Sequence, residues 1–345
     1  MLRFECDYTE GCIPEILEAI SRENHTQLQG YSEDVVSDRV RAKIRTLCGQ
    51  EDADVHFLVG GTQANTTIIA AALRPYQGVL SAAPGHIACH ETGAIEATGH
   101  KVIALPSDTG RICASQIRSY CAAHWADASH EHIVQPAMVY VSHPAENGSL
   151  YSLEELTEIR KACDEWNLTL FLDGARLGYG LTSPMTDVTL QDIARLTDVF
   201  YIGGTKVGAL FGEAVVITND ALKKDFRYMI KRHGGMLAKG WLLSLQFDVL
   251  LEDDRYFKIA RKAVMQAMRI KEAFEKKGCR FFMESWTNQQ FPILDKATLK
   301  KFDSGYTYSV WELIDAEYTA VRFATSWATT DAQVDQLVRD IEQFV

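Results

Sequence analysis

Two apolar runs in the middle of the chain each end in a short polar motif, and this pair limits the fold more than any other feature. Residues 168–172 and 199–202 are almost wholly aliphatic, β-branched or aromatic, so both are predicted to be strands buried on both faces of a sheet. The first run leads into Asp173-Gly174-Ala175-Arg176 and the second into Gly203-Gly204-Thr205-Lys206. Parallel sheets bind ligands beyond the carboxyl ends of their strands, so we expect both motifs at one binding site.

Asp173 and Lys206 together favour one flat cofactor between them. A carboxylate that ends one strand can lie beneath a ring nitrogen, and an amine beyond another strand can bond to a carbonyl carbon, as pyridoxal phosphate requires. Taken singly, Asp173 could cap the following helix, and Lys206 could be an ordinary solvated lysine. Their joint placement favours the cofactor, since Gly203, Gly204 and Gly208 leave room for a ligand near the backbone.

The glycine pair in Gly60-Gly61-Thr62-Gln63-Ala64-Asn65 is a further candidate element of this site. It lies between a predicted strand and a predicted helix, where free N–H groups at the positive end of the helix dipole can hold a phosphate. A plain strand-to-helix turn with Thr62 as the N-cap explains the segment equally well. The segment has no GxGxxG pattern, so a nicotinamide cofactor is disfavoured.

His86 and His90 stand four residues apart, so they share one helical face and could ligate zinc. A zinc site would need a third ligand and would leave Asp173 and Lys206 without a role, so we expect no metal. We favour an arrangement in which one histidine stacks on the cofactor ring and can also act as a base. The segment His130-Glu131-His132 is predicted to be a solvated loop.

Helical and strand patterns alternate along most of the chain, which predicts an α/β fold of βαβ units around a mainly parallel sheet. Strands are predicted at 54–59, 79–82, 101–105, 137–142, 168–172, 199–202 and 214–217, and helices at 13–21, 35–48 and 66–73. After Trp241 long helices dominate, including 256–277, with a strand near 320–324 and a last helix from Asp331. We therefore expect a large domain over residues 1–245 and a smaller one over residues 246–345.

Composition indicates an ordinary cytoplasmic enzyme. The chain has 345 residues, of which 47% are hydrophobic and 23% charged, and its net charge of −11 argues against a nucleic-acid surface. No run reaches about 18 apolar residues and the first residues hold no secretory apolar region, so neither a membrane span nor export is expected. The 8 cysteines form no CxxC pair, which fits reduced thiols.

Several short segments, in their order and spacing, resemble the low-specificity L-threonine aldolases. These belong to the β-eliminating lyases, within the aspartate-aminotransferase-like (fold type I) pyridoxal-phosphate enzymes. The resemblance covers essentially the whole chain and implies a mainly parallel sheet in a large cofactor-binding domain, plus a smaller C-terminal α+β domain. The matching segments are residues 4–11, 29–31 and 61–65, His86 with Glu91, Glu146-Asn147-Gly148, residues 173–176 and residues 203–206.

The resemblance implies a role for each residue of the cofactor site. The implied cofactor-binding residues are Gly61, Thr62, His86, Asp173, Arg176, Thr205, Lys206 and Lys231. Lys206 would bind pyridoxal phosphate covalently, and Asp173 would pair with the protonated ring nitrogen. The Gly61-Thr62 turn would hold the phosphate together with a cation, for which we prefer Lys231 to Arg232.

The resemblance also implies how an amino-acid substrate is bound. The implied substrate-binding residues are Cys6, Tyr31, Arg176 and Arg322. Arg322 matches an arginine that binds the α-carboxylate, a task that suits a planar two-pronged guanidinium. Cys6 stands where these enzymes usually carry serine. Tyr31 matches a segment near the active site of a neighbouring subunit, so a homodimer or homotetramer with shared active sites is implied.

The implied reaction is the cleavage of L-threonine or L-allo-threonine to glycine and an aldehyde. The catalytic residues would be Lys206, His86 as the base for the β-hydroxyl proton, and Glu91, which would orient His86. Another reaction of the same cofactor, such as β-elimination or racemisation, remains open. A non-catalytic cofactor-binding protein is the third alternative, although the retention of Lys206, Asp173, Arg176 and Arg322 argues against it.

Overall fold

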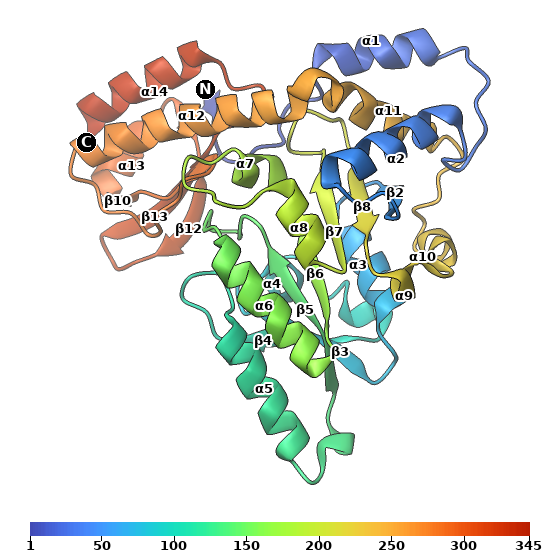
Figure 1. Cartoon of the computed structure of the whole chain (residues 1–345). Coiled ribbons are helices and arrows are strands. Elements are labelled where there is room, and N and C mark those ends of the chain that lie inside the picture. Colours follow the sequence, from blue (N-terminus) through green and yellow to red (C-terminus); the bar gives the residue numbers. More distant parts are fainter.

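A seven-stranded sheet forms the centre of the molecule, which is described over residues 1–345 by a computed structural model (Figure 1). The strand order is β2-β8-β7-β6-β5-β3-β4. Strands β4, β3, β5, β6 and β7 run parallel, while β8 is antiparallel to both of its neighbours, β7 and β2. The strands are β2 (Asp54–Leu58), β3 (Gln77–Ala82), β4 (Lys101–Leu105), β5 (Gln135–Ser142), β6 (Thr169–Asp173), β7 (Val199–Gly203) and β8 (Glu213–Ile217). The predicted α/β fold with a mainly parallel sheet is confirmed.

Helices cover both faces of this sheet. One face packs against α1 (Pro14–Glu23), α2 (Val35–Cys48), α5 (Ala114–Ala126), α6 (Leu153–Trp166), α8 (Leu190–Leu196) and α11 (Trp241–Leu250). The other face packs mainly against α3 (Gly61–Ala72) and α10 (Phe226–Arg232). The remaining short helices of this part are α4 (His86–Cys89), α7 (Leu177–Leu181), α9 (Asp220–Lys223) and the 3₁₀ turns Glu96–Thr98, His130–His132 and Glu252–Asp254. None of the helices is long and apolar enough to cross a membrane.

Strand alternation decides which side chains reach the site. Because successive side chains point to opposite faces of a strand, Phe200 and Ile202 enter the core beneath α2 and α11, whereas Val199 and Tyr201 face α3. Both faces are buried, which explains why these strands are continuous apolar runs in the sequence. The same alternation turns Asp173, at the end of β6, toward the face covered by α3, together with Phe171.

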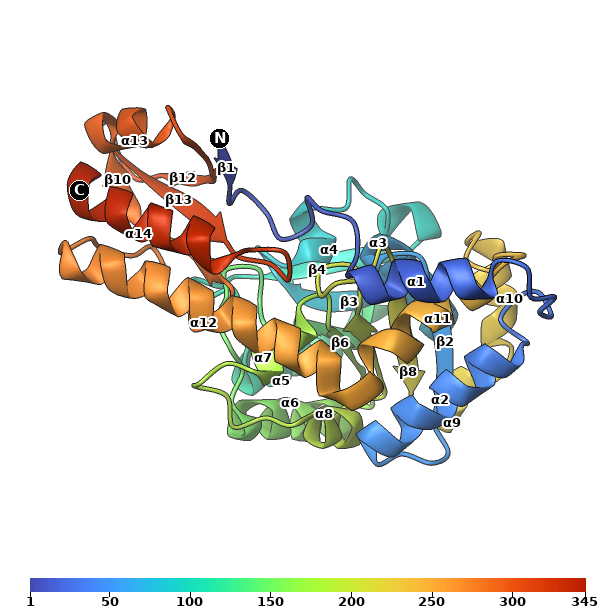
Figure 2. The same cartoon turned by 90° about the horizontal axis from the view of Figure 1, so that it is seen from above.

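A second, smaller core lies at the C-terminal end of the chain (Figure 2). Its sheet has the order β10-β13-β12, with β9 also pairing with β13, and β1 pairs separately with β11. The elements are β1 (Leu2–Arg3), β9 (Gln289–Gln290), β10 (Ile293–Asp295), β11 (Tyr306–Thr307), β12 (Ser309–Leu313), β13 (Tyr318–Ala324), α12 (Arg255–Lys276), α13 (Lys296–Phe302) and α14 (Asp331–Phe344).

The long helix α12 contributes to both cores. Its first half places Tyr256 and Ala260 in the large core, and its second half places Ile270 and Phe274 in the small one. Figure 2 shows α12 running from the sheet region to the C-terminal part. We propose that the chain has a large domain and a smaller C-terminal domain, as the sequence predicts. The predicted boundary at residue 245 lies inside α11, whose apolar side chains pack in the large core.

Most predicted elements have the expected places, with two informative differences. Helix α2 has the predicted bounds, but α3 begins at Gly61 rather than at residue 66 because Gly60 is its N-cap. The segment His130–His132 forms a 3₁₀ turn instead of a loop, and its first histidine ring lies 5.2 Å from the ring of Trp125. Local ring packing of this kind leaves no periodic signal in the sequence.

Substitution of Phe323 on β13 tests how much the small core contributes to stability. It is 1% exposed and its ring lies within 6.3 Å of the rings of Phe4, Phe274 and Phe302. We predict that Phe323→Ala lowers the free energy of unfolding by about 3–5 kcal/mol, because it leaves a cavity among large rings. Urea titration followed by circular dichroism measures the loss. Tyr228→Ala, at a side chain that is 74% exposed, should change it by less than about 0.5 kcal/mol.

Candidate active site

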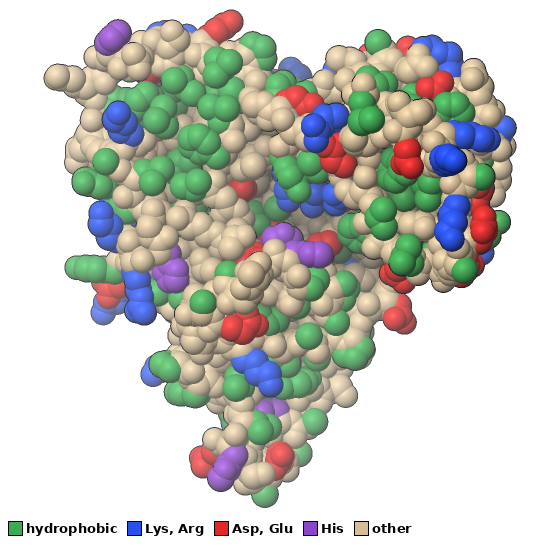
Figure 3. Space-filling model, turned by 180° about the vertical axis from the view of Figure 1, so that it is seen from behind, with side chains coloured by type: hydrophobic (Ala, Val, Ile, Leu, Met, Phe, Trp, Pro, Cys, Tyr) green, Lys and Arg blue, Asp and Glu red, His purple; other side chains and the backbone are tan.

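One cavity of about 770 Å³ opens where the parallel strands of the large sheet end. Its wall combines residues from strand ends, from the starts of α3 and α4, and from β12 and β13 of the C-terminal part. Figure 3 shows this hollow from behind, with histidine, lysine and arginine side chains gathered around it. The predicted site residues in its wall are Gly61, Thr62, His86, Asp173, Arg176, Thr205, Lys206 and Arg322. These residues lie far apart along the chain, and the fold brings them into one cavity wall.

Asp173 is a buried carboxylate with three donors. Its Oδ2 accepts hydrogen bonds from the Tyr140 hydroxyl at 2.6 Å and from Asn65 Nδ2 at 3.2 Å, and its Oδ1 accepts one from Ala175 N at 2.9 Å. Burial alone would raise the pKa of Asp173, but the charge of His86 and the Tyr140 hydrogen bond lower it below its usual value. The carboxylate is therefore ionised at neutral pH. Asp173 does not cap a helix, since α7 begins only at Leu177.

His86 is held by a carboxylate on one side of its ring. Its Nδ1 lies 2.7 Å from Glu91 Oε1, and the same oxygen accepts a hydrogen bond from Asn65 Nδ2 at 2.6 Å. Burial lowers the pKa of His86, but the Glu91 hydrogen bond and the charge of Asp173 raise it overall. The His90 ring lies 5.8 Å from that of His86 and also lines the cavity. The structure thus offers two histidines to a bound substrate, of which only His86 contacts Glu91.

Lys206 lies just beyond β7 with its side chain toward the cavity. Burial and the neighbouring Arg176 guanidinium lower the pKa of Lys206, while Asp7 and Asp173 act in the opposite direction. A lowered pKa increases the fraction of neutral amine, which is the nucleophilic form. The backbone at Lys206 is held in place by Tyr179, whose buried hydroxyl donates a 2.5 Å hydrogen bond to the carbonyl oxygen of Lys206.

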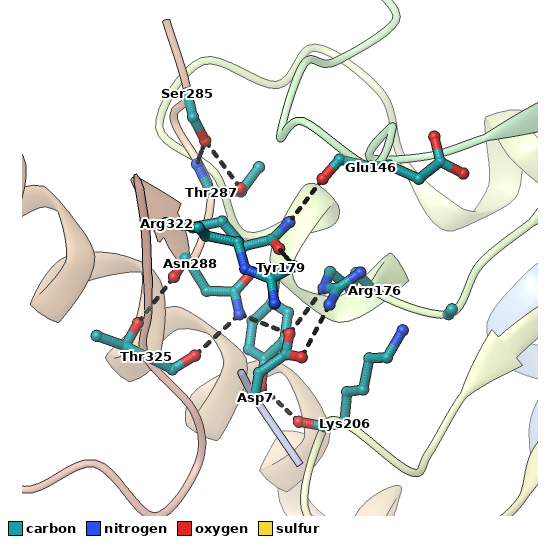
Figure 4. A network of polar contacts seen from close by, with 12 residues as sticks. Asp7, Glu146, Arg176, Tyr179, Lys206, Ser285, Thr287, Asn288, Arg322 and Thr325 are labelled. Atoms are coloured by element: carbon teal, nitrogen blue, oxygen red, sulfur yellow. Dashed lines mark hydrogen bonds and ion pairs between the residues drawn. The ribbon is translucent and has the colours of Figure 1, made fainter. Parts of the chain in front are cut away.

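Arg176 is oriented by an ion pair with the N-terminal segment (Figure 4). Its Nε and Nη2 donate to the two oxygens of Asp7 at 2.7 and 2.9 Å, and Asn288 Nδ2 donates to Asp7 Oδ2 at 2.9 Å. Asp7 is fully buried, which raises its pKa, but Arg176 and Lys206 outweigh this effect and lower the pKa to about 2. Sequence reasoning included Asp7 in a matching segment and gave it no role.

Arg322 projects from the middle of β13 into the cavity wall. Its Nη2 donates to the carbonyl oxygen of Glu5 at 2.7 Å and to Ser309 Oγ at 3.2 Å, and its Nη1 donates to Gln289 Oε1 at 3.2 Å. Burial and the charge of Arg176 lower the pKa of Arg322. These neutral partners leave the positive charge without a carboxylate, so an anionic ligand group can supply one.

Four predicted residues do not line this cavity, namely Cys6, Tyr31, Glu91 and Lys231, and of these Glu91 contacts the cavity residue His86. Cys6 is half-buried in the N-terminal segment, and the Tyr31 ring is 46% exposed and lies 5.1 Å from Lys231 Nζ. The roles of Cys6, Tyr31 and Lys231 therefore stay predictions. Sequence reasoning gave no role to other cavity residues, namely Tyr201, Glu146 and Glu213. Tyr201 and Glu213 belong to ordinary strands, and Glu146 lies in a turn beyond β5 within a matching segment.

The glycine turn before α3 presents backbone N–H groups that can donate hydrogen bonds to a ligand. Gly60 is the N-cap of α3, and no side chain caps the helix, so the alternative with Thr62 as N-cap is wrong. The first N–H groups of a helix have no acceptor within it, and both Gly61 and Thr62 line the cavity. A phosphate can bind there. No group of three or more histidine, cysteine or acidic side chains is placed to hold a metal ion.

Comparison with known proteins places the chain in a family. The sequence model of the family described as beta-eliminating lyase matches residues 7–297. The chain belongs to the beta-eliminating lyase family. A low specificity L-threonine aldolase from a Pseudomonas species is 28% identical over 98% of this chain and 96% of its own length. The solved structure of Leishmania major threonine aldolase is 42% identical, with a TM-score of 0.97 and 99% coverage of both chains.

The wider fold is that of the aspartate-aminotransferase-like enzymes. Thermus thermophilus aspartate aminotransferase superposes with a TM-score of 0.70 over 100% of this chain and 92% of its own, at 14% identity. At that identity the likeness shows the fold alone. Together with the family, it confirms the predicted fold type I architecture. This lyase is accordingly a pyridoxal-phosphate-dependent enzyme.

The buried Asp7–Arg176 pair provides a test of this site. We predict that Asp7→Asn lowers the free energy of unfolding by about 3–5 kcal/mol, because it leaves the Arg176 charge buried without a partner. The folded-state pKa of about 2 lies below the usual value, so the pair's contribution is present above pH ~4 and disappears as the pH falls toward 2. Urea titrations at pH 7 measure the loss. Asp38→Asn, whose side chain is 71% exposed beside Arg41, should cost no more than about 1 kcal/mol.

Proposed function

We propose that this lyase is an L-threonine aldolase, which cleaves L-threonine or L-allo-threonine to glycine and acetaldehyde. One observation carries the proposal: the Lys206 amine, the ionised Asp173 carboxylate, the Arg322 guanidinium and the His86 ring all face one cavity. The names of the similar proteins from Pseudomonas and Leishmania major support the same activity.

The cavity residues fit pyridoxal phosphate. Asp173 would pair with the protonated ring nitrogen, since its three donors keep it ionised. Lys206 would hold the cofactor covalently through an amine whose lowered pKa favours the neutral form. The Gly61 and Thr62 backbone would hold the phosphate at the start of α3. When bound, pyridoxal phosphate withdraws electrons from the bonds to the substrate's Cα.

Substrate orientation is assigned to the two arginines. Arg322 would bind the α-carboxylate, because its charge faces the cavity and its protein partners are all neutral. Arg176 lies beside Lys206 and would complete the positive wall, with Asp7 fixing its direction. A carboxylate held in this way directs the rest of the amino acid toward the His86 side of the cavity.

Proton transfer is assigned to His86. Glu91 holds its Nδ1, so Nε2 is the atom that can accept the proton of the substrate's β-hydroxyl, directly or through a water molecule. Removal of that proton allows the β-oxygen to become the aldehyde oxygen as the Cα–Cβ bond breaks. Glu91 then stabilises the positive charge that His86 has gained.

We further propose that the enzyme works in the cytoplasm as a homodimer or homotetramer with shared active sites. All 8 cysteines are free thiols, as expected of a reducing compartment. Tyr31 is 46% exposed beside Lys231, and Tyr8 at the cavity mouth is 54% exposed. Exposed aromatic side chains of this kind are common in subunit contacts.

The purified protein gives a direct test of this function. We predict a visible absorption band from the cofactor bound to Lys206, and release of acetaldehyde and glycine when L-threonine is added. Lys206→Ala should lose the band and the activity while folding normally by circular dichroism. A keto acid with ammonia, or the opposite enantiomer of the substrate, would instead indicate elimination or racemisation.

The two histidines can be separated by substitution. We predict that His86→Ala lowers kcat for L-threonine by about 10²–10⁴-fold, because the general base is lost. His90→Ala, measured beside it, should have the smaller effect, since His90 does not contact Glu91. A decrease within a few-fold for His86→Ala, or a larger loss for His90→Ala, would move the base from His86.

A further inference from the structure

Glu213 is a buried acid in the cavity wall to which the reaction gives no task. It begins β8 and is 3% exposed. Its Oε1 accepts a 2.9 Å hydrogen bond from the Thr205 hydroxyl, whereas its Oε2 is buried and has no hydrogen-bond partner. A carboxyl oxygen left without a partner beside a ligand cavity indicates a contact that the ligand supplies.

The register of the sheet places Glu213 at the phosphate end of the site. In the β2–β8 pair it lies opposite Leu58, which ends the strand that leads into the Gly60-Gly61 turn. In the β7–β8 pair it lies opposite Gly203, which leads into Thr205 and Lys206. Glu213, Gly61 and Thr62 all line the same cavity. The carboxyl group therefore stands between the phosphate-binding turn and the cofactor-binding lysine.

The surroundings decide its protonation state. Lys206 beyond β7 favours the charged form, while Asp173 at the end of β6 disfavours it. The hydroxyls of Tyr201 on β7 and Tyr256 on α12 lie near enough for the Glu213 charge to raise the pKa of both. Burial is the largest effect and raises the pKa of Glu213 to about 8. From β2 and the start of α3, the residues at this level are the uncharged Leu58, Gly61 and Thr62.

We propose that Glu213 binds the cofactor in its protonated form and donates a hydrogen bond from Oε2 to the phosphate group. A carboxylate at this place would repel the phosphate dianion, whereas the neutral acid complements the N–H donors at the start of α3. When Glu213 is ionised in the free protein, binding takes up one proton from solvent. This inference rests on the cofactor site of the proposed function and is independent of which amino acid is cleaved.

The test uses two probes that cannot bond to Lys206, pyridoxine 5′-phosphate and pyridoxine. The dissociation constants of both are measured by fluorescence from pH 7 to pH 9, where the phosphate is already a dianion. Their ratio isolates the contribution of the phosphate. With a pKa of about 8 for Glu213, the advantage of the phosphate form should fall about tenfold over this range in the wild type.

Glu213→Gln keeps the shape of the side chain and a neutral hydrogen-bond donor. The ratio of its two dissociation constants should therefore not change from pH 7 to pH 9, and should match that of the wild type within about threefold at pH 7. Glu146→Gln is the matched control: Glu146 is another cavity acid, whose Oε1 already accepts from Ser142 Oγ and His86 N at 2.8 Å, and this variant should keep the wild-type pH dependence. An unchanged pH dependence in Glu213→Gln would overturn the proposal, as would failure of pyridoxine 5′-phosphate to bind.

A second measurement needs no variant and covers the case in which Glu213→Gln does not fold. Calorimetry of the wild type at pH 8.5, in two buffers of different ionisation enthalpy, gives the number of protons taken up. Both probes carry the same ring nitrogen, so we expect pyridoxine 5′-phosphate to take up most of one proton more than pyridoxine does; equal uptake for both would overturn the proposal. A protein that passes these tests without releasing acetaldehyde would refute the aldolase activity alone.

Discussion

The buried Asp173 carboxylate is the group on which the arrangement of this site depends. Removing an ionised carboxylate from water costs several kcal/mol, and only well-placed donors can offset that cost. Tyr140 from β5, Asn65 from α3 and the backbone of Ala175 supply those donors. Each of them is placed by a different element, so the carboxylate stays charged only if β5, β6 and α3 are correctly packed together. The charged state that the chemistry needs at Asp173 therefore depends on the correct packing of the fold around it.

Asp173 and Glu213 show how the same sheet face can hold two acids in opposite states. Both lie at strand ends on the side covered by α3. Asp173 has three hydrogen-bond donors, and its pKa is lowered, whereas Glu213 has one donor, and its pKa is raised to about 8. The charge of His86 and the hydrogen bonds to Asp173, rather than the depth of burial, separate the two. A charged acid at one end of the cavity and a neutral one at the other suit a ligand with a cationic ring nitrogen and an anionic tail.

The sequence predicts the large sheet well because each of its strands carries its own signal. The runs that became β6 and β7 are apolar on both faces, and the motifs that follow them predicted Asp173 and Lys206 at one site. The short strands β1, β9 and β11 were not predicted, because segments of 2 residues have no periodicity to read. Glu213 and Asp7 were not recognised as site residues for a related reason. Their importance comes from partners that are remote in sequence, such as Arg176 and the turn at Gly60.

The side of the cavity that Arg176 and Arg322 line is assembled from both parts of the chain. Arg322 comes from the C-terminal sheet and is held by the Glu5 carbonyl of the N-terminal segment, while Asp7 from that segment holds Arg176 of the large part. Residues 5–7 therefore connect the two arginines that line the cavity. Because β1 pairs with β11, this segment is also attached to the C-terminal part. The Asp7–Arg176 ion pair and the hydrogen bond from Arg322 to the Glu5 carbonyl therefore help to fix the position of Arg322 relative to Arg176, although the two residues belong to different cores.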